Sequence, residues 1–141
     1  MAALGGSPKR LKGPILKQDD SYERGRAMRF EMFGEPGVRS LDNADDFADP
    51  LQDLVTRLCF GDVWSRPGLD RKIRSMLTIA ILVGQSRPDQ LRNHVKGALA
   101  NGVTKEEIRE ILMHATIYVG LPAGSDSWRH AREALQEAGA Y

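Results

Sequence analysis

Apolar residues recur at helical spacing along most of the chain, and helix start and stop signals lie between the apolar stretches. Asp20 followed by Glu23 forms an N-terminal cap, which predicts a helix that ends at Gly34. After Asp49 and Pro50, a favourable helix start, apolar residues repeat at intervals of three and four positions. This pattern predicts a second helix through residue 59. The segment 61–70, GDVWSRPGLD, contains two glycines and a proline and is predicted to be a loop.

The second half of the chain has a similar helical pattern. A polar turn followed by an almost fully apolar stretch predicts a buried central helix over residues 71–84, although its β-branched residues would also suit a strand. The next helix is expected from Ser86 to a left-handed cap at Asn101 and Gly102. Thr104 and Glu107 form a capping box, which predicts a helix that ends at residue 120, and residues 125–138 form the last expected helix.

These elements define the expected fold class. No pair of strands with a hairpin turn signal is present, so the sequence predicts an all-α domain of five to six helices. The two helices on either side of Gly102 are joined by a very short connection, which predicts an antiparallel helical hairpin. Residues 1–20 are predicted to be a flexible basic arm before a single domain at 21–141.

Composition narrows the range of functions. With 20 basic and 19 acidic residues the net charge is +1, so we expect no nucleic-acid or anionic-membrane partner. No apolar run approaches the roughly 20 residues that cross a bilayer, and the N-terminus lacks a signal-like stretch, so a cytoplasmic protein is expected. The single cysteine, Cys59, excludes an internal disulfide and a cysteine zinc cluster. No two of the three histidines stand at spacing that places both on one helix face, and we expect no metal.

The spacing of apolar residues indicates His94 as a candidate catalytic residue. On an ideal helix it lies beside the buried stripe formed by Leu91, Val95, Ala98 and Leu99. An imidazole in that position is a packed structural residue or a proton carrier, and the spacing leaves both open.

Two motifs resemble the carboxymuconolactone decarboxylase family. The first runs across the predicted hairpin and consists of His94, Ala98, Gly102, Thr104, Glu106, Glu107 and Ile108. The second is the segment CFGDVWSRPGLDRKIRS at residues 59–75, and further matches are Tyr22, Gly25, Arg29, Gly34, Tyr118, Gly120 and Pro122. The resemblance spans residue 22 to the C-terminus.

The resemblance implies a fold, an activity and an assembly. The fold is the alkylhydroperoxidase D-like (AhpD-like) helical domain. The activity is cofactor-free decarboxylation of 4-carboxymuconolactone to the 3-oxoadipate enol-lactone in protocatechuate catabolism, the β-ketoadipate pathway. The assembly is a homo-oligomer, a trimer or a ring-like hexamer, which also agrees with a central helix that is apolar on nearly every side.

Other members of the same superfamily are thiol peroxidases, which carry a Cys-x-x-Cys pair just before the equivalent histidine and a glutamate one helix earlier. Here those positions hold Arg87, Gln90 and Ser75, so the thiol relay is missing. Two further functions stay open. One is that of a lyase, isomerase or hydrolase of the family that acts on another lactone or unsaturated acid, and the second is that of a non-catalytic oligomeric binding protein.

For the decarboxylase the resemblance implies site residues. His94 is expected to donate a proton to the dienolate or a hydrogen bond to the lactone oxygen. Guanidinium groups suit the substrate carboxylates, and the candidates are Arg66, Arg71 and Arg74, which could instead be solvated surface charges.

Four more residues are counted as substrate-binding, and each could instead be structural. Trp64 is expected to form a wall of the site or to pack the loop, and Asp62 to orient a cationic group or to lie in a surface turn. Cys59 is expected to line the site or to serve as packing, and Tyr118 to lie in a helix core with its hydroxyl reaching a partner.

Overall fold

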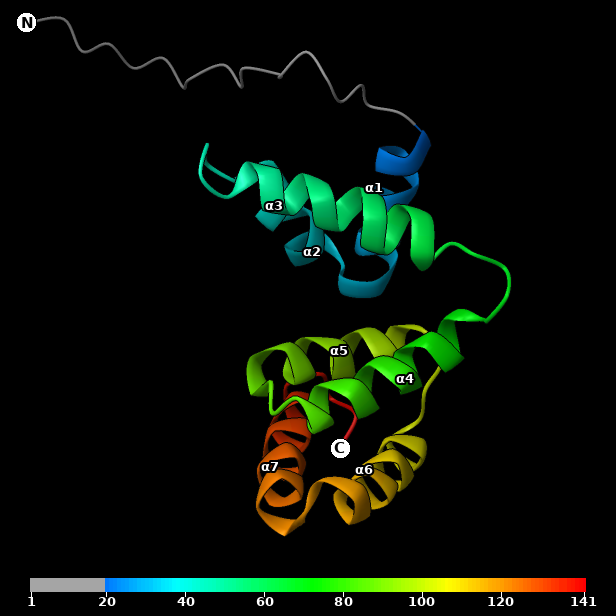
Figure 1. The fold of residues 1–141 in the computed structure, drawn as a ribbon, viewed down its shortest axis with the longest axis vertical. Helices are drawn as coiled ribbons and strands as arrows, with labels where there is room; N and C mark the ends of the chain where they lie inside the picture. Colours follow the sequence, from blue (N-terminus) through cyan, green and yellow to red (C-terminus); the bar gives the residue numbers. More distant parts are fainter. Residues whose placement is uncertain (1–19) are drawn as a thin grey trace, which may run out of the picture.

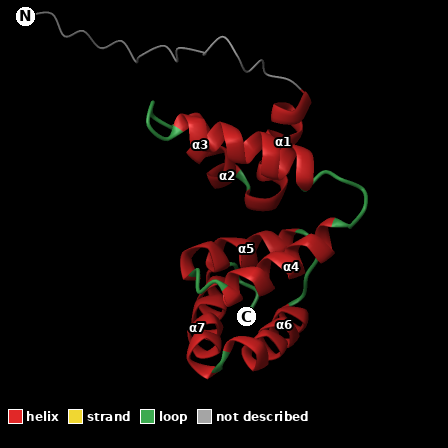
Figure 2. Ribbon diagram, in the orientation of Figure 1, coloured by secondary structure: helices red, strands yellow, loops and turns green. Residues whose placement is uncertain are grey.

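The computed structural model describes residues 20–141, and this part of the chain consists of helices joined by loops, without a strand (Figures 1 and 2). The all-α prediction is confirmed. The predicted arm lies, apart from Asp20, outside the described residues. The elements are α1 Asp20–Phe33, α2 Glu35–Asp42, α3 Asp49–Leu54, a π-helix η1 Val55–Val63, α4 Arg71–Gly84, α5 Pro88–Ala100, α6 Lys105–Val119 and α7 Leu121–Glu137.

The helices form two layers that meet along α1 and α5. Figure 1 shows α1, α2, α3 and η1 as one group and α4 to α7 as the other, joined by the segment that follows η1. The second group holds the larger hydrophobic core, in which Ile79 and Val83 of α4 are completely buried with Val95 of α5 and Ile108 of α6. Burial of this apolar surface is the main stabilising contribution to the fold.

The capping box at Thr104 and the left-handed cap at Gly102 are confirmed, whereas Asp49 and Ser86 are not caps, because Ala48 precedes α3 and Arg87 precedes α5 without a capping side-chain hydrogen bond. Asp70 caps α4, because its Oδ1 accepts a hydrogen bond from the Ile73 amide at 2.8 Å. At α6, Thr104 Oγ1 accepts from the Glu107 amide at 3.1 Å and a Glu107 carboxylate oxygen accepts from the Thr104 amide at 2.9 Å. Gly102 has a φ of 87°, the left-handed conformation expected after α5.

Several boundaries differ from the prediction. Residues 61–63, expected in a loop, continue the π-helix η1, and α7 begins at Leu121 rather than at residue 125. Helix α2 was not predicted at all. Its Pro36 and Gly37 resemble a turn in sequence, but Pro36 lies in the first turn of the helix, where a missing N–H costs nothing.

The predicted antiparallel packing of α5 against α6 also needs correction. The connection at Gly102 is as short as expected, but both helices make their main contacts with α4 and α7 rather than with each other (Figure 1). The two helices therefore lie on different sides of the bundle, and α5 is left free to contact α1.

Two glycines explain why α1 and η1 lie so close. A Cβ atom at Gly25 would come within 1.8 Å of the Thr56 carbonyl oxygen, and one at Gly61 within 2.1 Å of the Ser21 carbonyl oxygen. Gly61 is therefore not the helix breaker that its position suggested; it permits backbone contact between two helices. This contact fixes the end of η1, which carries Cys59, Phe60 and the following Trp64.

Candidate active site

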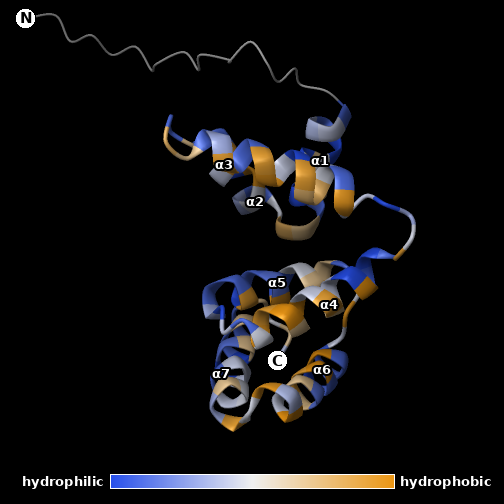
Figure 3. Ribbon diagram, in the orientation of Figure 1, coloured by the Kyte–Doolittle hydropathy of each residue, from blue (hydrophilic) through white to orange (hydrophobic). Residues whose placement is uncertain are grey.

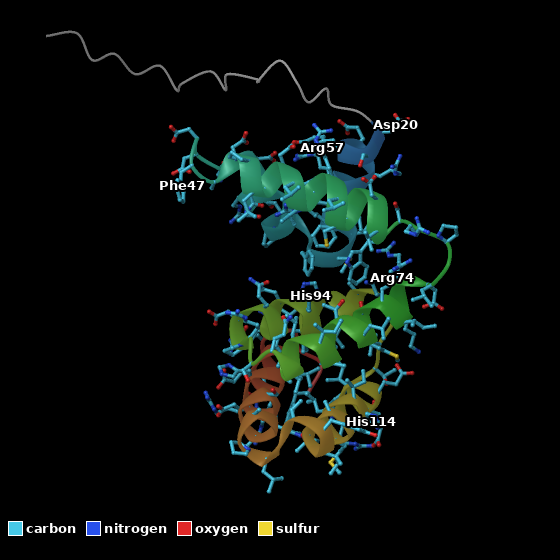
Figure 4. All side chains as sticks on the ribbon, in the orientation of Figure 1. Asp20, Phe47, Arg57, Arg74, His94 and His114 are labelled. Atoms are coloured by element: carbon cyan, nitrogen blue, oxygen red, sulfur yellow. The ribbon has the colours of Figure 1, made fainter. Side chains whose placement is uncertain are left out.

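The imidazole of His94 lies on α5 between the two layers, surrounded by aromatic rings (Figure 4). Phe33, the last residue of α1, meets it edge to face, with ring centroids 5.5 Å apart and an interplanar angle of 90°. Trp64 stacks on it at 6.4 Å and 24°. Phe60 continues the stack against Trp64 at 6.1 Å and 29°. Ring contacts of this kind fix the orientation of the imidazole.

The local electrostatics favour an uncharged imidazole. Burial lowers the pKa of His94 from 6.5 to about 4, so the ring is neutral at pH 7. Its Nδ1 is buried without a hydrogen-bond partner among residues 20–141. A buried polar atom left unpaired costs about 1–3 kcal/mol, and such atoms are often kept for a functional reason. The ring therefore has a free polar atom beside an apolar, aromatic wall.

The π-helix places Trp64 through Cys59. The backbone amide of Trp64 donates to the Cys59 carbonyl at 2.9 Å. The indole ring is buried and stacks on His94, so it packs against the imidazole. Burial raises the pKa of the Cys59 thiol, which keeps it protonated at neutral pH.

The three candidate arginines are in different states. Arg71 is held by an ion pair with Glu31 and by a 3.1 Å hydrogen bond from its Nε to Asn101 Oδ1. Arg74 donates from Nη2 to the Arg66 carbonyl oxygen at 3.2 Å, while its Nε is buried and has no partner within residues 20–141. Arg66 is exposed. Figure 4 places Arg74 and His94 at the same level, where the two layers face each other.

Asp62 and Tyr118 lie elsewhere. Asp62 accepts hydrogen bonds from Ser21 at 2.5 Å and from Arg24 at 3.3 Å, and so joins η1 to α1. Tyr118 is 78% exposed and contacts His114 on α6, with ring centroids 5.1 Å apart. The expected position of Tyr118 in a helix core is therefore wrong for the single chain. The structure brings His94, Trp64 and Cys59 together and does not bring Tyr118 to them.

The sequence interpretation missed Phe33 as a site residue. A glycine in the middle of α5 was an available signal, because a glycine inside a helix often marks a close approach of another element. At Gly97, three residues after His94, a Cβ atom would lie 2.8 Å from Phe33 Cε1. The close approach of Phe33 to α5 thus depends on Gly97.

Arg29 was also missed as a structural residue, although it was part of the family resemblance. Its buried guanidinium group donates to four neutral acceptors, and burial lowers its pKa. The acceptors are the Gly37 carbonyl oxygen at 2.8 Å, Thr56 Oγ1 at 3.0 Å, Ser40 Oγ at 2.7 Å and Gln52 Oε1 at 2.9 Å. These bonds tie α1 to α2, α3 and η1, and so fix the layer that carries Phe33 and Trp64.

Metal-ligand clusters and membrane-spanning helices are both absent from residues 20–141. This part of the chain contains no group of three or more histidine, cysteine or acidic side chains arranged to hold a metal ion. No helix in the same range is both long enough and apolar enough to cross a bilayer.

Comparison with known proteins agrees with the sequence motifs. The carboxymuconolactone decarboxylase family matches residues 49–137. A 4-carboxymuconolactone decarboxylase from Acinetobacter baylyi is 41% identical over 125 residues, which cover 88% of this chain and 93% of that protein. Nitrosuccinic acid decarboxylase npaB from Metarhizium robertsii is 44% identical over 103 residues, or 72% of each chain. The chain therefore belongs to the carboxymuconolactone decarboxylase family.

Proposed function

We propose that this protein is a carboxy-lyase that converts 4-carboxymuconolactone to the 3-oxoadipate enol-lactone, without a metal or organic cofactor. The observation that carries the proposal is 41% identity across 93% of a protein named for that activity. The reaction belongs to protocatechuate catabolism, and a cytoplasmic location is part of the same proposal.

The substrate supplies its own electron sink. The bond between the ring carbon and the carboxylate breaks, CO₂ leaves, and the electron pair moves through the ring double bond onto the lactone carbonyl oxygen. A proton is then added to the carbon next to that carbonyl, which gives the enol-lactone. The protein must hold two carboxylates, stabilise the delocalised anion and supply one proton.

We assign the proton to His94. The empty site holds a neutral imidazole, because burial lowers the pKa of His94 to about 4. A bound dianion raises that pKa, since a nearby negative charge favours imidazolium in a poorly solvated pocket. The imidazolium then gives its proton to the ring carbon and recovers one from water. The unpaired Nδ1 supports this role, because it leaves the imidazole free to hydrogen-bond with substrate.

Arg74 is our first choice for a substrate carboxylate, and Arg66 is the second. The unpaired Nε of Arg74 offers a donor to an anion, and exposed Arg66 is linked to Arg74 through its carbonyl oxygen. Arg71 already bonds to Glu31 and Asn101, so its guanidinium group is not free to pair with a substrate carboxylate. It contributes positive electrostatic potential instead. Trp64 and Phe33 exclude water from the anion.

We also propose that the protein is a homo-oligomer, a trimer or hexamer, joined through α4 and α6. A pocket of about 680 Å³ between these helices has an apolar lining that includes Met76, Leu77 and Ile111. Exposed hydrophobic residues extend this surface, and Figure 3 shows hydrophobic stretches along both helices. They are Ile73, Leu77, Ile81, Met113, Ile117 and Tyr118. Light scattering tests this assembly: a Leu77→Asp variant should lower the mass, and a monomeric parent protein would contradict it.

A second candidate is decarboxylation of another acid whose anion is stabilised by its own substituent. The nitrosuccinic acid decarboxylase at 44% identity favours it, because a nitro group spreads the charge left by CO₂ much as a lactone carbonyl does. This candidate keeps the same roles for His94 and the arginines and changes the substrate alone.

The test is to mix purified protein with freshly generated 4-carboxymuconolactone and, separately, with nitrosuccinate, and to follow CO₂ release. In D₂O the enol-lactone should carry one deuterium next to the carbonyl. Because general acid catalysis contributes about 100-fold or more, His94→Gln should lower kcat by at least that factor. The matched control Asn93→Gln changes the exposed neighbouring residue on α5 and should keep the parent rate. Absence of CO₂ with 4-carboxymuconolactone refutes the substrate, and an unchanged rate in His94→Gln refutes the proton donor.

A further inference from the structure

A second groove lies between α6 and α7. It is separate from His94, which lies on α5 between the two layers (Figure 4). It has a volume of about 490 Å³. Its floor is apolar and consists of Ile108, Leu112, Ala131 and Leu135, all buried. Half-buried Trp128 adds an aromatic surface to this floor. The solvent-exposed part of the apolar lining is therefore aromatic: it consists of Trp128 and of Tyr141, which is 60% exposed, and a flat apolar group would cover these rings.

The rim of this groove is basic. Four cationic residues line it: Lys105, Arg109, Arg129 and Arg132. Within residues 20–141, Lys105 and Arg132 form no ion pair, while Arg109 and Arg129 meet exposed carboxylates only at 3.4 to 3.8 Å. An anion in the groove would therefore meet two unpaired cations. Lys105 is also the first residue of α6, where the helix dipole already creates positive potential.

Tyr141 connects the two unpaired cations. Its ring centroid lies 5.2 Å from Lys105 Nζ and 5.1 Å from Arg132 Cζ. Cation–π contacts of this kind hold both charges beside the groove. Tyr141 also lines the groove, where its ring faces the same space as that of Trp128. Positive charge and aromatic surface are thus combined in one small cavity.

We propose that this groove binds an organic anion with a flat apolar body, of the class of aromatic carboxylates. The carboxylate pairs with Lys105 and Arg132, and the ring packs against Trp128 and Tyr141. A small inorganic anion satisfies the cations and leaves the two aromatic rings exposed, and a neutral aromatic molecule does the reverse. The site shares no residue with the His94 cluster, so the protein would have a second, separate ligand site.

The two tryptophans allow a direct binding measurement. In a Trp64→Phe variant the remaining tryptophan is Trp128, so its fluorescence reports on the groove. Benzoate should change that fluorescence saturably, while benzyl alcohol and inorganic phosphate at the same concentrations should not. Adding Lys105→Gln and Arg132→Gln should weaken benzoate binding at least about tenfold, which corresponds to about 1.4 kcal/mol.

The matched control adds Arg26→Gln and Arg39→Gln, which remove two positive charges from α1 and α2, and it should bind benzoate as Trp64→Phe does. Circular dichroism confirms that each variant is folded. The proposal is overturned by the absence of a saturable change with benzoate, by equal affinity in the Lys105 and Arg132 variant, or by an equal response to phosphate. Because the assay follows binding and not turnover, its outcome is independent of the proposed decarboxylation.

Discussion

The low pKa of His94 makes the stability of the fold depend on pH in a defined way. In the unfolded chain the imidazole has a pKa of 6.5, and in the folded chain burial lowers the pKa to about 4. Between these values the unfolded chain binds more protons than the folded chain, so acid favours unfolding. The contribution is complete above pH 6.5 and is lost as the pH falls toward 4.

The magnitude follows from those two values. At pH 4.5 almost all unfolded molecules carry the proton on this imidazole, while most folded molecules do not. The difference corresponds to roughly 2–3 kcal/mol of unfolding free energy lost between pH 7.5 and pH 4.5. This is a large share of the 5–15 kcal/mol that is typical of a domain.

Urea unfolding at the two pH values, at one protein concentration, measures this loss. The loss should be smaller in His94→Gln than in the parent by roughly 2–3 kcal/mol, since glutamine does not titrate. Asn93→Gln is the matched control: this exposed residue lies next to His94 on α5, and its variant should show the parent loss. An NMR titration of the His94 ring gives the pKa directly. If His94→Gln loses as much stability as the parent, the imidazole is not held neutral by burial, and the assignment of its environment is wrong.

Three further predictions test other parts of the structure. Gly25→Ala should lower the free energy of unfolding by at least about 3 kcal/mol, because its Cβ would overlap a carbonyl oxygen of η1 at 1.8 Å. The control Gly68→Ala has open space around its Cβ and should change the free energy of unfolding by less than about 0.5 kcal/mol. Arg74→Gln should raise KM for a dicarboxylate substrate about 10- to 100-fold, while the exposed Arg39→Gln should leave KM unchanged; equal effects would remove Arg74 from the site. Thr104→Ala should cost about 1 kcal/mol in urea unfolding through loss of the capping box, and a neutral result would contradict that geometry.

The fold class and most helix starts could be predicted because they depend on local chemistry. Asp70 and Thr104 cap helices through hydrogen bonds to amides three residues away, which spacing alone reveals. The π-helix through Gly61 could not be predicted, because it depends on contact with α1, which is 40 residues earlier in the chain. Only that contact distinguishes a glycine that breaks a helix from one that lets two helices meet.

The site was predictable in part for the same reason. The histidine and the tryptophan were identifiable from their motifs, and the structure stacks them at 6.4 Å. Phe33 and Arg29 act through tertiary contacts, so neither the spacing nor the composition revealed them. Tyr118 matched a motif, yet it lies 78% exposed on the apolar face of α6, which a single sequence does not distinguish from the core.

The imidazole and the rings that face it come from separate halves of the chain. His94 lies on α5, while Phe33 belongs to α1, upstream of the family match at residues 49–137. Substitutions in that upstream stretch can therefore alter the surroundings of the imidazole without moving the helix that carries His94. Relatives with the same reactive group can in this way diverge in substrate, and directed evolution toward a new acid should begin by randomising positions on α1 rather than on α5.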